Sequence, residues 1–262
     1  MKLHIETIGD GPDLALIHGW GMHGGVWDGV RASLARHFCL HVVDLPGYGA
    51  SPAIEPYGLD GLARAVAAML PEKVHVCGWS LGGQVALEMA RLFPQQVARL
   101  VLTATTPRFT AAEEWPWAVE REVLLAFSAD LESDYAGTLK RFLSLQARGD
   151  GAAKAVLKRL RDSLFARGRP ATEVLRAGLK ILLESDLRDR VARVQAPALL
   201  LHGERDMLTP VAAARWLAER MPAARLQVMP GAAHAPFLSH PDEFTDMATG
   251  FLVPYDSTLY ET

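Results

Sequence analysis

A serine in the first third of the chain stands in a pattern suited to nucleophilic catalysis. Gly78-Trp79-Ser80-Leu81-Gly82 fits G-x-S-x-G, follows the apolar run 74–78 and opens a helical pattern over 81–92. A strand-to-helix turn of this kind is a nucleophile elbow, which exposes the serine hydroxyl above the end of a sheet. The helix dipole there favours developing negative charge. The pattern predicts Ser80 as a nucleophile; the alternative is a serine that caps an ordinary helix.

A serine hydroxyl needs a base that takes its proton, and His234 is the best-placed histidine. It lies in Gly231-Ala232-Ala233-His234-Ala235-Pro236, just after the predicted strand 226–229. The carboxyl ends of strands are where open α/β sheets hold their sites. His18 and His202 also end strands but precede glycines, so we expect structural roles for them, and His240 suits helix capping or the surface. The other histidines have no supporting context: His4, His23, His37, His41 and His75.

The base in turn needs a carboxylate that holds its tautomer and stabilises the imidazolium. Asp206 lies in the loop after the predicted strand 198–201, and its main competitor is the neighbouring Glu204. Ser80, Asp206 and His234 follow one another in the order typical of a nucleophile on such an elbow. Asp44 also follows a strand, but the sequence Asp44-Leu45-Pro46-Gly47 favours a role in a turn.

The tetrahedral intermediate of acyl transfer needs hydrogen-bond donors for its oxyanion. One donor is expected to be the backbone N–H of Leu81, the residue after the nucleophile. The other is expected from the loop after the strand 14–18, where His18-Gly19-Trp20-Gly21 makes Trp20 the candidate. The Trp20 indole could also form a wall of the substrate pocket, and the alternative is plain core packing.

The order of apolar runs predicts an α/β fold with a mostly parallel sheet. Strand patterns over 14–18, 39–44, 74–78 and 100–103 alternate with helical spacing, and strands resume at 197–203 and 226–229 before a last helix over 241–252. Strands separated by helices favour a parallel sheet covered on both faces. Between about 110 and 185 the periodicity is helical throughout. We therefore expect a core of residues 1–109 and 186–262, a helical lid over 110–185, and a loose tail over 253–262.

Composition excludes several classes of protein. The 262 residues hold no apolar run long enough to span a bilayer, and the N-terminus lacks the apolar core of a signal peptide. The two cysteines, Cys39 and Cys77, lie in strand-like runs and are interpreted as buried free thiols. We expect a cytoplasmic monomer that needs no metal and no organic cofactor, and that binds neither membranes nor nucleic acids.

Charge is distributed unevenly along the chain. Residues 140–176 hold ten basic and three acidic side chains, a net charge of +7, although the whole chain carries −3. A local reversal of this size indicates an anionic partner. The alternative is a solvated basic helix face. Nucleic acid is a weaker candidate because the segment lacks interleaved aromatic residues.

From about Leu14 to Leu252 the sequence resembles the carboxylesterases of biotin biosynthesis, which demethylate pimeloyl-[acyl-carrier protein] methyl ester. The elbow and the turn 42–49 occur throughout α/β-hydrolases, whereas the Trp20 and Trp79 contexts are more specific. Further support comes from Glu114-Trp115-Pro116, from Arg141 to Gln146, and from the segment 232–241. The resemblance implies an α/β-hydrolase fold and hydrolysis of that methyl ester to free pimeloyl-[acyl-carrier protein] and methanol.

The resemblance also implies further site residues. The acyl pocket is expected to lie beside Trp20 and Leu81 and to be lined by Phe142, Leu143, Ser144, Leu145 and Gln146. Docking of the acidic carrier protein is expected at Arg141, Lys154 and Lys158. Gly137 stands where the family has a further cation, so the chain departs from the family's pattern at that position.

Two other functions fit the same residues. The first is a broad-specificity short-chain carboxylesterase or ring-cleavage-product hydrolase of the same fold, because an apolar pocket discriminates weakly between neighbouring acyl lengths. The second is a non-catalytic ligand receptor on a hydrolase scaffold, which the presence of Ser80, Asp206 and His234 argues against.

Overall fold

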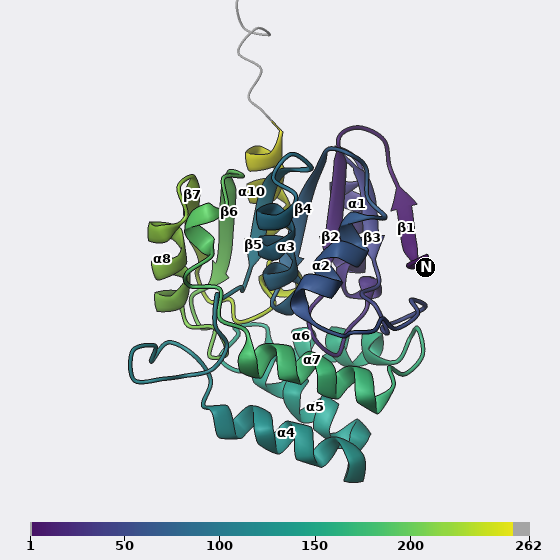
Figure 1. Cartoon of the computed structure of the whole chain (residues 1–262), viewed down its shortest axis with the longest axis vertical. Coiled ribbons are helices and arrows are strands. Elements are labelled where there is room, and N and C mark those ends of the chain that lie inside the picture. Colours follow the sequence, from purple (N-terminus) through teal and green to yellow (C-terminus); the bar gives the residue numbers. More distant parts are fainter. Residues whose placement is uncertain (1, 254–262) are drawn as a thin grey trace, which may run out of the picture.

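The computed structural model describes residues 2–253, and its centre is a seven-stranded sheet (Figure 1). The strand order is β1-β3-β2-β4-β5-β6-β7. All neighbouring pairs are parallel except β1 with β3, which are antiparallel. The strands are β1 (Ile5–Ile8), β2 (Asp13–Ile17), β3 (Cys39–Val43), β4 (Val74–Trp79), β5 (Val97–Thr103), β6 (Ala198–Gly203) and β7 (Ala224–Met229).

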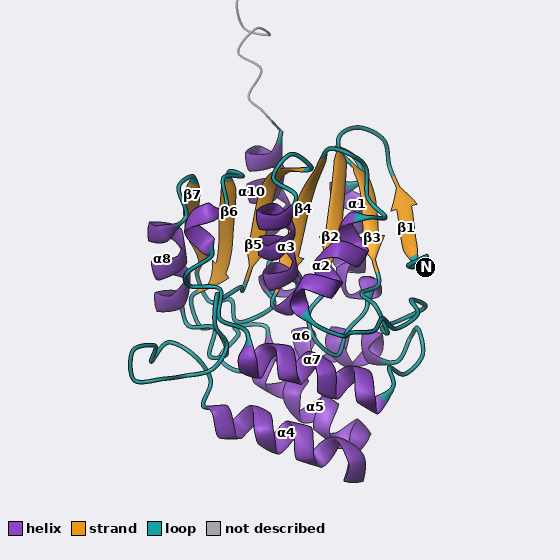
Figure 2. Ribbon diagram, viewed as in Figure 1, coloured by secondary structure: helices purple, strands orange, loops and turns teal. Residues whose placement is uncertain are grey.

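Helices cover both faces of this sheet, which explains why its central strands read as continuous apolar runs. Every residue of β6 is buried. Helices α2 and α3 lie on one face, and α1 and α10 lie on the other (Figure 2). The bounds of the core helices are α1 (Asp28–Leu34), α2 (Leu59–Ala67), α3 (Leu81–Leu92), α8 (Val211–Arg220), α9 (Pro236–Ser239) and α10 (Pro241–Leu252), with short 3₁₀ turns at Gly24–Trp27 and Val191–Arg193.

The predicted α/β fold with a mostly parallel sheet is confirmed. The six strands expected from apolar runs are present, with ends within a few residues of the predicted ones. Strand β1 was not predicted, because its four residues IETI are only partly buried and carry a weak pattern. Helices α1 and α8 were also not predicted.

Four helices between β5 and β6 form a layer beyond the carboxyl ends of the parallel strands (Figure 1). They are α4 (Arg121–Ser133), α5 (Tyr135–Gln146), α6 (Ala153–Leu164) and α7 (Thr172–Glu184). We call residues 110–185 the helical insertion. Its first eleven residues are irregular, and an isolated bridge between Arg108 and Asp186 joins the two connections to the core.

Three further expectations concern membrane spans, the C-terminal tail and the two cysteines. None of the helices described within residues 2–253 is long and apolar enough to cross a bilayer. The predicted loose tail lies, apart from Val253, outside the described residues. Cys77 is buried as expected, whereas Cys39 is only partly buried because it starts β3 near the rim of the sheet.

Candidate active site

Ser80 occupies a strained turn between β4 and α3. Its backbone has φ 58° and ψ −118°, a left-handed conformation that residues with a Cβ seldom adopt. The turn is held because the Ser80 N–H donates to the Thr103 carbonyl at 3.0 Å, while the Ser80 carbonyl accepts from Gly83 N at 3.0 Å. The strain directs the hydroxyl away from both elements, which is the geometry of a nucleophile elbow.

The two glycines of the motif permit this turn because their backbones approach other backbones closely. A Cβ at Gly78 would collide with the carbonyl of Gly82. A Cβ at Gly82 would collide with the carbonyl oxygens of Ile17 and His18, at the end of β2. Any larger residue would push the start of α3 away from the sheet and displace Ser80.

The structure brings Ser80, His234 and Asp206 into one hydrogen-bonded chain. The distance from His234 Nε2 to Ser80 Oγ is 2.9 Å, and that from His234 Nδ1 to Asp206 Oδ2 is 2.8 Å. An ionised carboxylate only accepts, so Nδ1 carries the proton and Nε2 is free to accept the serine proton. Three residues from β4, β6 and β7 connections thus meet at one edge of the sheet.

Asp206 is held in place by more than the histidine. Its Oδ1 accepts from the backbone N–H groups of Leu208 and Thr209, each at 2.9 Å, and its Oδ2 accepts from Thr209 Oγ1 at 2.7 Å. Burial alone would raise the pKa of this carboxyl, but the electrostatic attraction and hydrogen bond of His234, the nearby His202 and the N–H of Thr209 lower it below the ordinary value. Thr209 was not predicted as a site residue, although a threonine three residues after an aspartate is a recognisable local hydrogen-bonding pattern.

The competing candidates have other partners. Glu204 is exposed, and its carboxylate accepts from the backbone N–H of Gly231 at 3.0 Å. His18 is buried between the Gly19 carbonyl and the Leu45 N–H, at 2.8 and 3.0 Å, and burial lowers its pKa to about 4. His202 Nε2 donates to the Thr209 carbonyl, and burial lowers the pKa of His202 as well. Both histidines are therefore neutral, and their hydrogen bonds stabilise loops at the site.

The two segments that carry the expected oxyanion donors meet at the serine. Within residues 2–253, the N–H groups of Trp20 and Leu81 donate no hydrogen bond to another group of the chain. The loop that carries Trp20 touches the elbow, because a Cβ at Gly19 would come 3.2 Å from Ser80 Cβ. Two unpaired donors at the start of α3 and after β2 suit a developing oxyanion.

Trp20 also connects the core with the helical insertion. Its indole Nε1 donates to the Leu175 carbonyl of α7 at 2.9 Å, and its ring lies edge-on to Phe142 of α5, with ring centroids 4.7 Å apart. The side chain is 1% exposed. It therefore packs in the core and links the loop after β2 to α5 and α7 of the helical insertion.

Three of the five residues expected to line the acyl pocket are buried, and the other two are not. Phe142, Leu143 and Gln146 are buried, and the Gln146 carbonyl accepts from the His234 N–H at 3.2 Å. Ser144 is exposed and bonds the Lys140 carbonyl, so the structure does not bring it to the site. Leu145 is half-buried and lines a separate cavity of about 240 Å³. An α-helix turns about 100° per residue, so five consecutive residues cannot share one face.

The expected docking cations are all on the surface of the helical insertion. Arg141 is tied to Asp130 and Asp134, each at 2.8 Å, and Lys158 pairs with Asp162. Lys154 has no carboxylate within 4 Å among the described residues. The charge of the segment is thus partly neutralised inside the molecule, and Lys154 is the cation of these three that remains unpaired.

Comparison with known proteins places the chain in a family. The sequence model of the alpha/beta hydrolase family matches residues 14–247. An esterase from Exiguobacterium antarcticum superimposes with a TM-score of 0.85 at 24% identity, covering 96% of this chain and 95% of that one. An enol-lactonase from Burkholderia xenovorans gives a TM-score of 0.82 at 23% identity, covering 95% and 96%. At these identities the likeness concerns the fold alone.

Closer similarity is found among named relatives. A protein of Nitrosomonas europaea named pimeloyl-[acyl-carrier protein] methyl ester esterase is 50% identical over 93% of this chain and 96% of its own length. Proteins with the same name from Chromobacterium violaceum and Aeromonas salmonicida are 48% and 42% identical, over 93% and 96% of this chain and 95% and 100% of their own lengths. The chain therefore belongs to the alpha/beta hydrolase family and, within it, to the family of the pimeloyl-[acyl-carrier protein] methyl ester esterases.

Proposed function

We propose that this protein is a serine carboxylesterase that hydrolyses the methyl ester of pimeloyl-[acyl-carrier protein], as the names of its relatives say of them. The observation that carries the proposal is the hydrogen-bonded chain from Ser80 through His234 to Asp206. An activated serine beside two unpaired N–H donors is the arrangement that acyl transfer requires.

The reaction follows from the geometry in two steps. His234 Nε2 takes the Ser80 proton while Oγ attacks the ester carbonyl, and the N–H groups of Trp20 and Leu81 bind the oxyanion. His234 then protonates the departing methanol, which leaves an acyl-enzyme. Water attacks the acyl-enzyme with His234 again as base, and the free carboxylic acid leaves.

The helical insertion acts in this proposal as a lid over the site. Ser80 and His234 are only 3% and 1% exposed, so an acyl chain can reach them only if the side chains that cover them move. Trp20, Phe142 and Leu143 then offer the apolar surface that a pimeloyl chain needs. Exclusion of bulk water strengthens the interactions with the developing charge.

Methanol release from pimeloyl-[acyl-carrier protein] methyl ester, measured beside hydrolysis of a simple butyrate ester, tests the proposed substrate. Efficient turnover of the carrier-protein ester is the expected result. Turnover of the butyrate alone would leave a serine esterase of broad specificity and reject the carrier-protein substrate. Inactivity on both, with no labelling by a fluorophosphonate probe, would reject the esterase itself.

Charge reversal of the docking cations should weaken carrier-protein substrates selectively. The combined change of Arg141, Lys154 and Lys158 to Glu is expected to lower kcat/KM for the carrier-protein ester about tenfold or more, since each rim charge mainly affects association. Hydrolysis of the butyrate ester should stay unchanged. Among the single changes, Lys154→Glu should have the largest effect, because the other two cations already have carboxylate partners.

Lys180→Glu is the matched control for these variants. Lys180 is an exposed lysine of α7 whose nearest carboxylate is Glu184 at 4.0 Å. Its reversal changes the net charge by the same amount but lies on another helix of the insertion. Equal losses for Lys180→Glu and Lys154→Glu, or equal losses on both classes of ester, would contradict docking at α6.

A further inference from the structure

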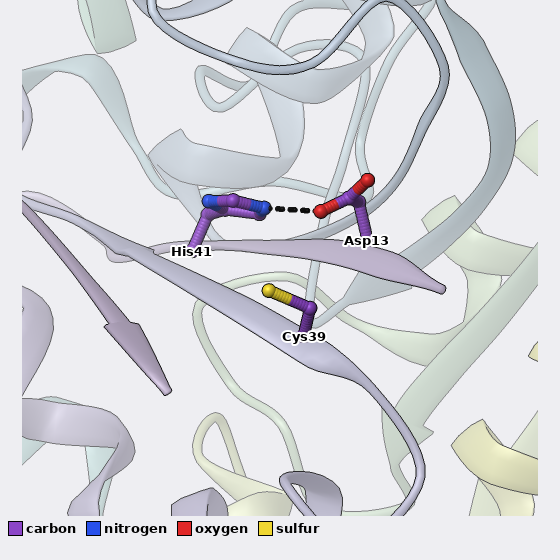
Figure 3. Close-up of side chains that lie close together, drawn as sticks. All are labelled: Asp13, Cys39 and His41. Carbon is purple, nitrogen blue, oxygen red and sulfur yellow. Dashed lines mark hydrogen bonds and ion pairs between the residues drawn. The ribbon is translucent and has the colours of Figure 1, made fainter. Parts of the chain in front are cut away.

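Three side chains with metal-binding groups lie close together (Figure 3). They stand towards the amino ends of β2 and β3, whereas Ser80 follows the carboxyl end of β4. Asp13 is the first residue of β2, and its register partner Cys39 is the first residue of β3. His41 follows Cys39 by two residues, so its side chain lies on the same face of the sheet. These residues are separated along the chain, and only the register of β2 with β3 brings them together.

The donor atoms are close enough to share one ion. His41 Nε2 lies 2.6 Å from Asp13 Oδ1, and one donor atom of each of the three residues lies within 4.8 Å of the other two. The side chains of His41 and Asp13 are 13% and 33% exposed, so an ion can enter from solvent. The donors stand on paired strands and not on loops, and the ladder therefore holds them in register.

We propose that Asp13, Cys39 and His41 bind a zinc ion, with water in the fourth position. A thiolate, an imidazole and a carboxylate are the ligands that zinc takes in proteins, at about 2.0–2.3 Å. The two negative ligands balance the charge of the ion. In a tetrahedral site neighbouring ligand atoms are roughly 3.4 Å apart, so the His41–Asp13 pair has to open by less than about 1 Å.

The site lies far from the proposed chemistry. The five residues of β2 separate Asp13 from the loop after Ile17, a length of about 15 Å at the rise of a strand. Bound zinc would therefore join β2 to β3 without touching Ser80. We expect it to stabilise the folded chain and to leave ester hydrolysis unchanged.

Cobalt titration of the chelator-treated full chain tests the site. One equivalent of Co²⁺ should give a thiolate-to-cobalt charge-transfer band and the strong visible bands of a tetrahedral site, and Zn²⁺ should abolish both. Cys39→Ser should remove the charge-transfer band. His41→Gln should weaken affinity by about tenfold or more. Thermal unfolding of the full chain, but not of Cys39→Ser, should shift upward with added Zn²⁺.

His37→Gln is the matched control, because His37 is an exposed histidine two residues before Cys39 and lies outside the cluster. It should bind cobalt like the unchanged chain. A charge-transfer band that persists in Cys39→Ser would overturn the proposal. So would the absence of any band in the full chain, which would leave Asp13 and His41 as a hydrogen-bonded pair beside an unengaged thiol.

A second inference comes from the connection between α5 and α6, which lies against the loop that carries His234. Asp150 Oδ2 accepts from the Ala233 N–H at 2.9 Å, and Gly151 N donates to the Gly231 carbonyl at 2.9 Å. The His234 N–H donates to the Gln146 carbonyl at 3.2 Å. The helical insertion thus forms hydrogen bonds with Gly231, Ala233 and His234 of the loop that presents the proposed base.

Of the three hydrogen bonds just described, only the one from Ala233 is accepted by a side chain, that of Asp150. It is 7% exposed, and its other oxygen accepts from the Ala152 N–H at 2.7 Å. Within residues 2–253 it has no ion pair, so backbone N–H groups alone stabilise its charge. Loss of the carboxylate would leave the buried Ala233 N–H without an acceptor, next to His234, and the loop would shift to satisfy it.

We infer that Asp150 is a positioning residue that makes the placement of His234 depend on the position of the helical insertion. This inference rests on the proposed function, in which His234 is the base. Movement of α5 and α6, which the proposed carrier-protein contact would bias, changes the hydrogen bonds of the His234 loop directly. The coupling needs no contact between the partner and the catalytic residues.

Kinetics of Asp150→Ala and Asp150→Asn on the butyrate ester test this inference. Asp150→Ala should lower kcat by about ten- to a hundredfold, the usual cost of a misplaced catalytic group, and leave KM nearly unchanged. Asp150→Asn should recover part of the loss, because the amide oxygen can still accept from Ala233. Asp162→Ala, which removes an exposed carboxylate of α6, should be neutral.

The outcomes separate this inference from the proposed function. The positioning role would be overturned if Asp150→Ala lowered the melting temperature but left kcat unchanged when kcat is measured at temperatures well below melting. Equal losses for Asp150→Ala and Asp162→Ala would do the same. By contrast, an unchanged chain that hydrolyses no ester would reject the proposed function itself.

Discussion

Ser80→Ala is expected to abolish ester hydrolysis, with kcat falling by up to about 10⁶ if Ser80, His234 and Asp206 act as a unit. The variant removes one oxygen and keeps the Cβ, so the turn at φ 58° is as strained as before and the fold should persist. The variant can still bind the ester and offer the oxyanion donors, but it has no nucleophile. The measurement is kcat on the butyrate ester, together with covalent labelling by a fluorophosphonate.

Ser144→Ala is the matched control for this variant. Ser144 is an exposed serine of α5 whose hydroxyl bonds the Lys140 carbonyl, and its loss should leave kcat within experimental error. A Ser80→Ala protein that retains substantial activity after purification would reject Ser80 as the nucleophile. Labelling that persists in Ser80→Ala would point to another reactive serine.

Asp206→Asn is expected to lower kcat by about 10⁴, with little effect on stability. The asparagine oxygen can still accept from the N–H groups of Leu208 and Thr209. Its amide NH₂ would then face His234 Nδ1 and donate to it. That contact favours the tautomer with the proton on Nε2, which cannot accept the proton of Ser80.

Glu204→Gln tests whether Asp206, and not Glu204, is the carboxylate that supports His234. Glu204 accepts from the Gly231 N–H, a contact that a glutamine oxygen can keep. Its kcat should therefore be close to that of the unchanged chain, while Asp206→Asn is nearly inactive. Similar losses for the two variants would mean that the loop as a whole, and not Asp206 Oδ2, supports the histidine.

Local sequence was enough to predict most strands of the sheet and the chain order of the three proposed catalytic residues. Buried parallel strands are short continuous apolar runs, and this made six of the seven strands recognisable; β1 is partly buried and was not. Because parallel strands end at one edge of the sheet, a serine, an aspartate and a histidine that each follow a strand were expected to meet. Their separations of 126 and 28 residues along the chain did not obscure this, since strand ends define the place.

The tertiary structure decided what depends on orientation and on contacts between distant segments. The hydrogen bonds at Asp206 and Glu204 separate two carboxylates that differ by only two positions. The orientation of α5 about its own axis buries Phe142 and exposes Ser144. Composition counts charges but not their partners, so only the folded chain shows Arg141 held by two aspartates.

The residues of the proposed zinc site and of the Asp150 contact also meet only in the folded chain. Asp13 and His41 meet because β2 pairs with β3, and Asp150 reaches Ala233 across 83 residues because the helical insertion folds back over the sheet. Apolar patterns specify which residues are buried within an element, since the pattern is a local property. Which side chains then face each other is set by packing and hydrogen bonds between elements, and these form only when the whole chain folds.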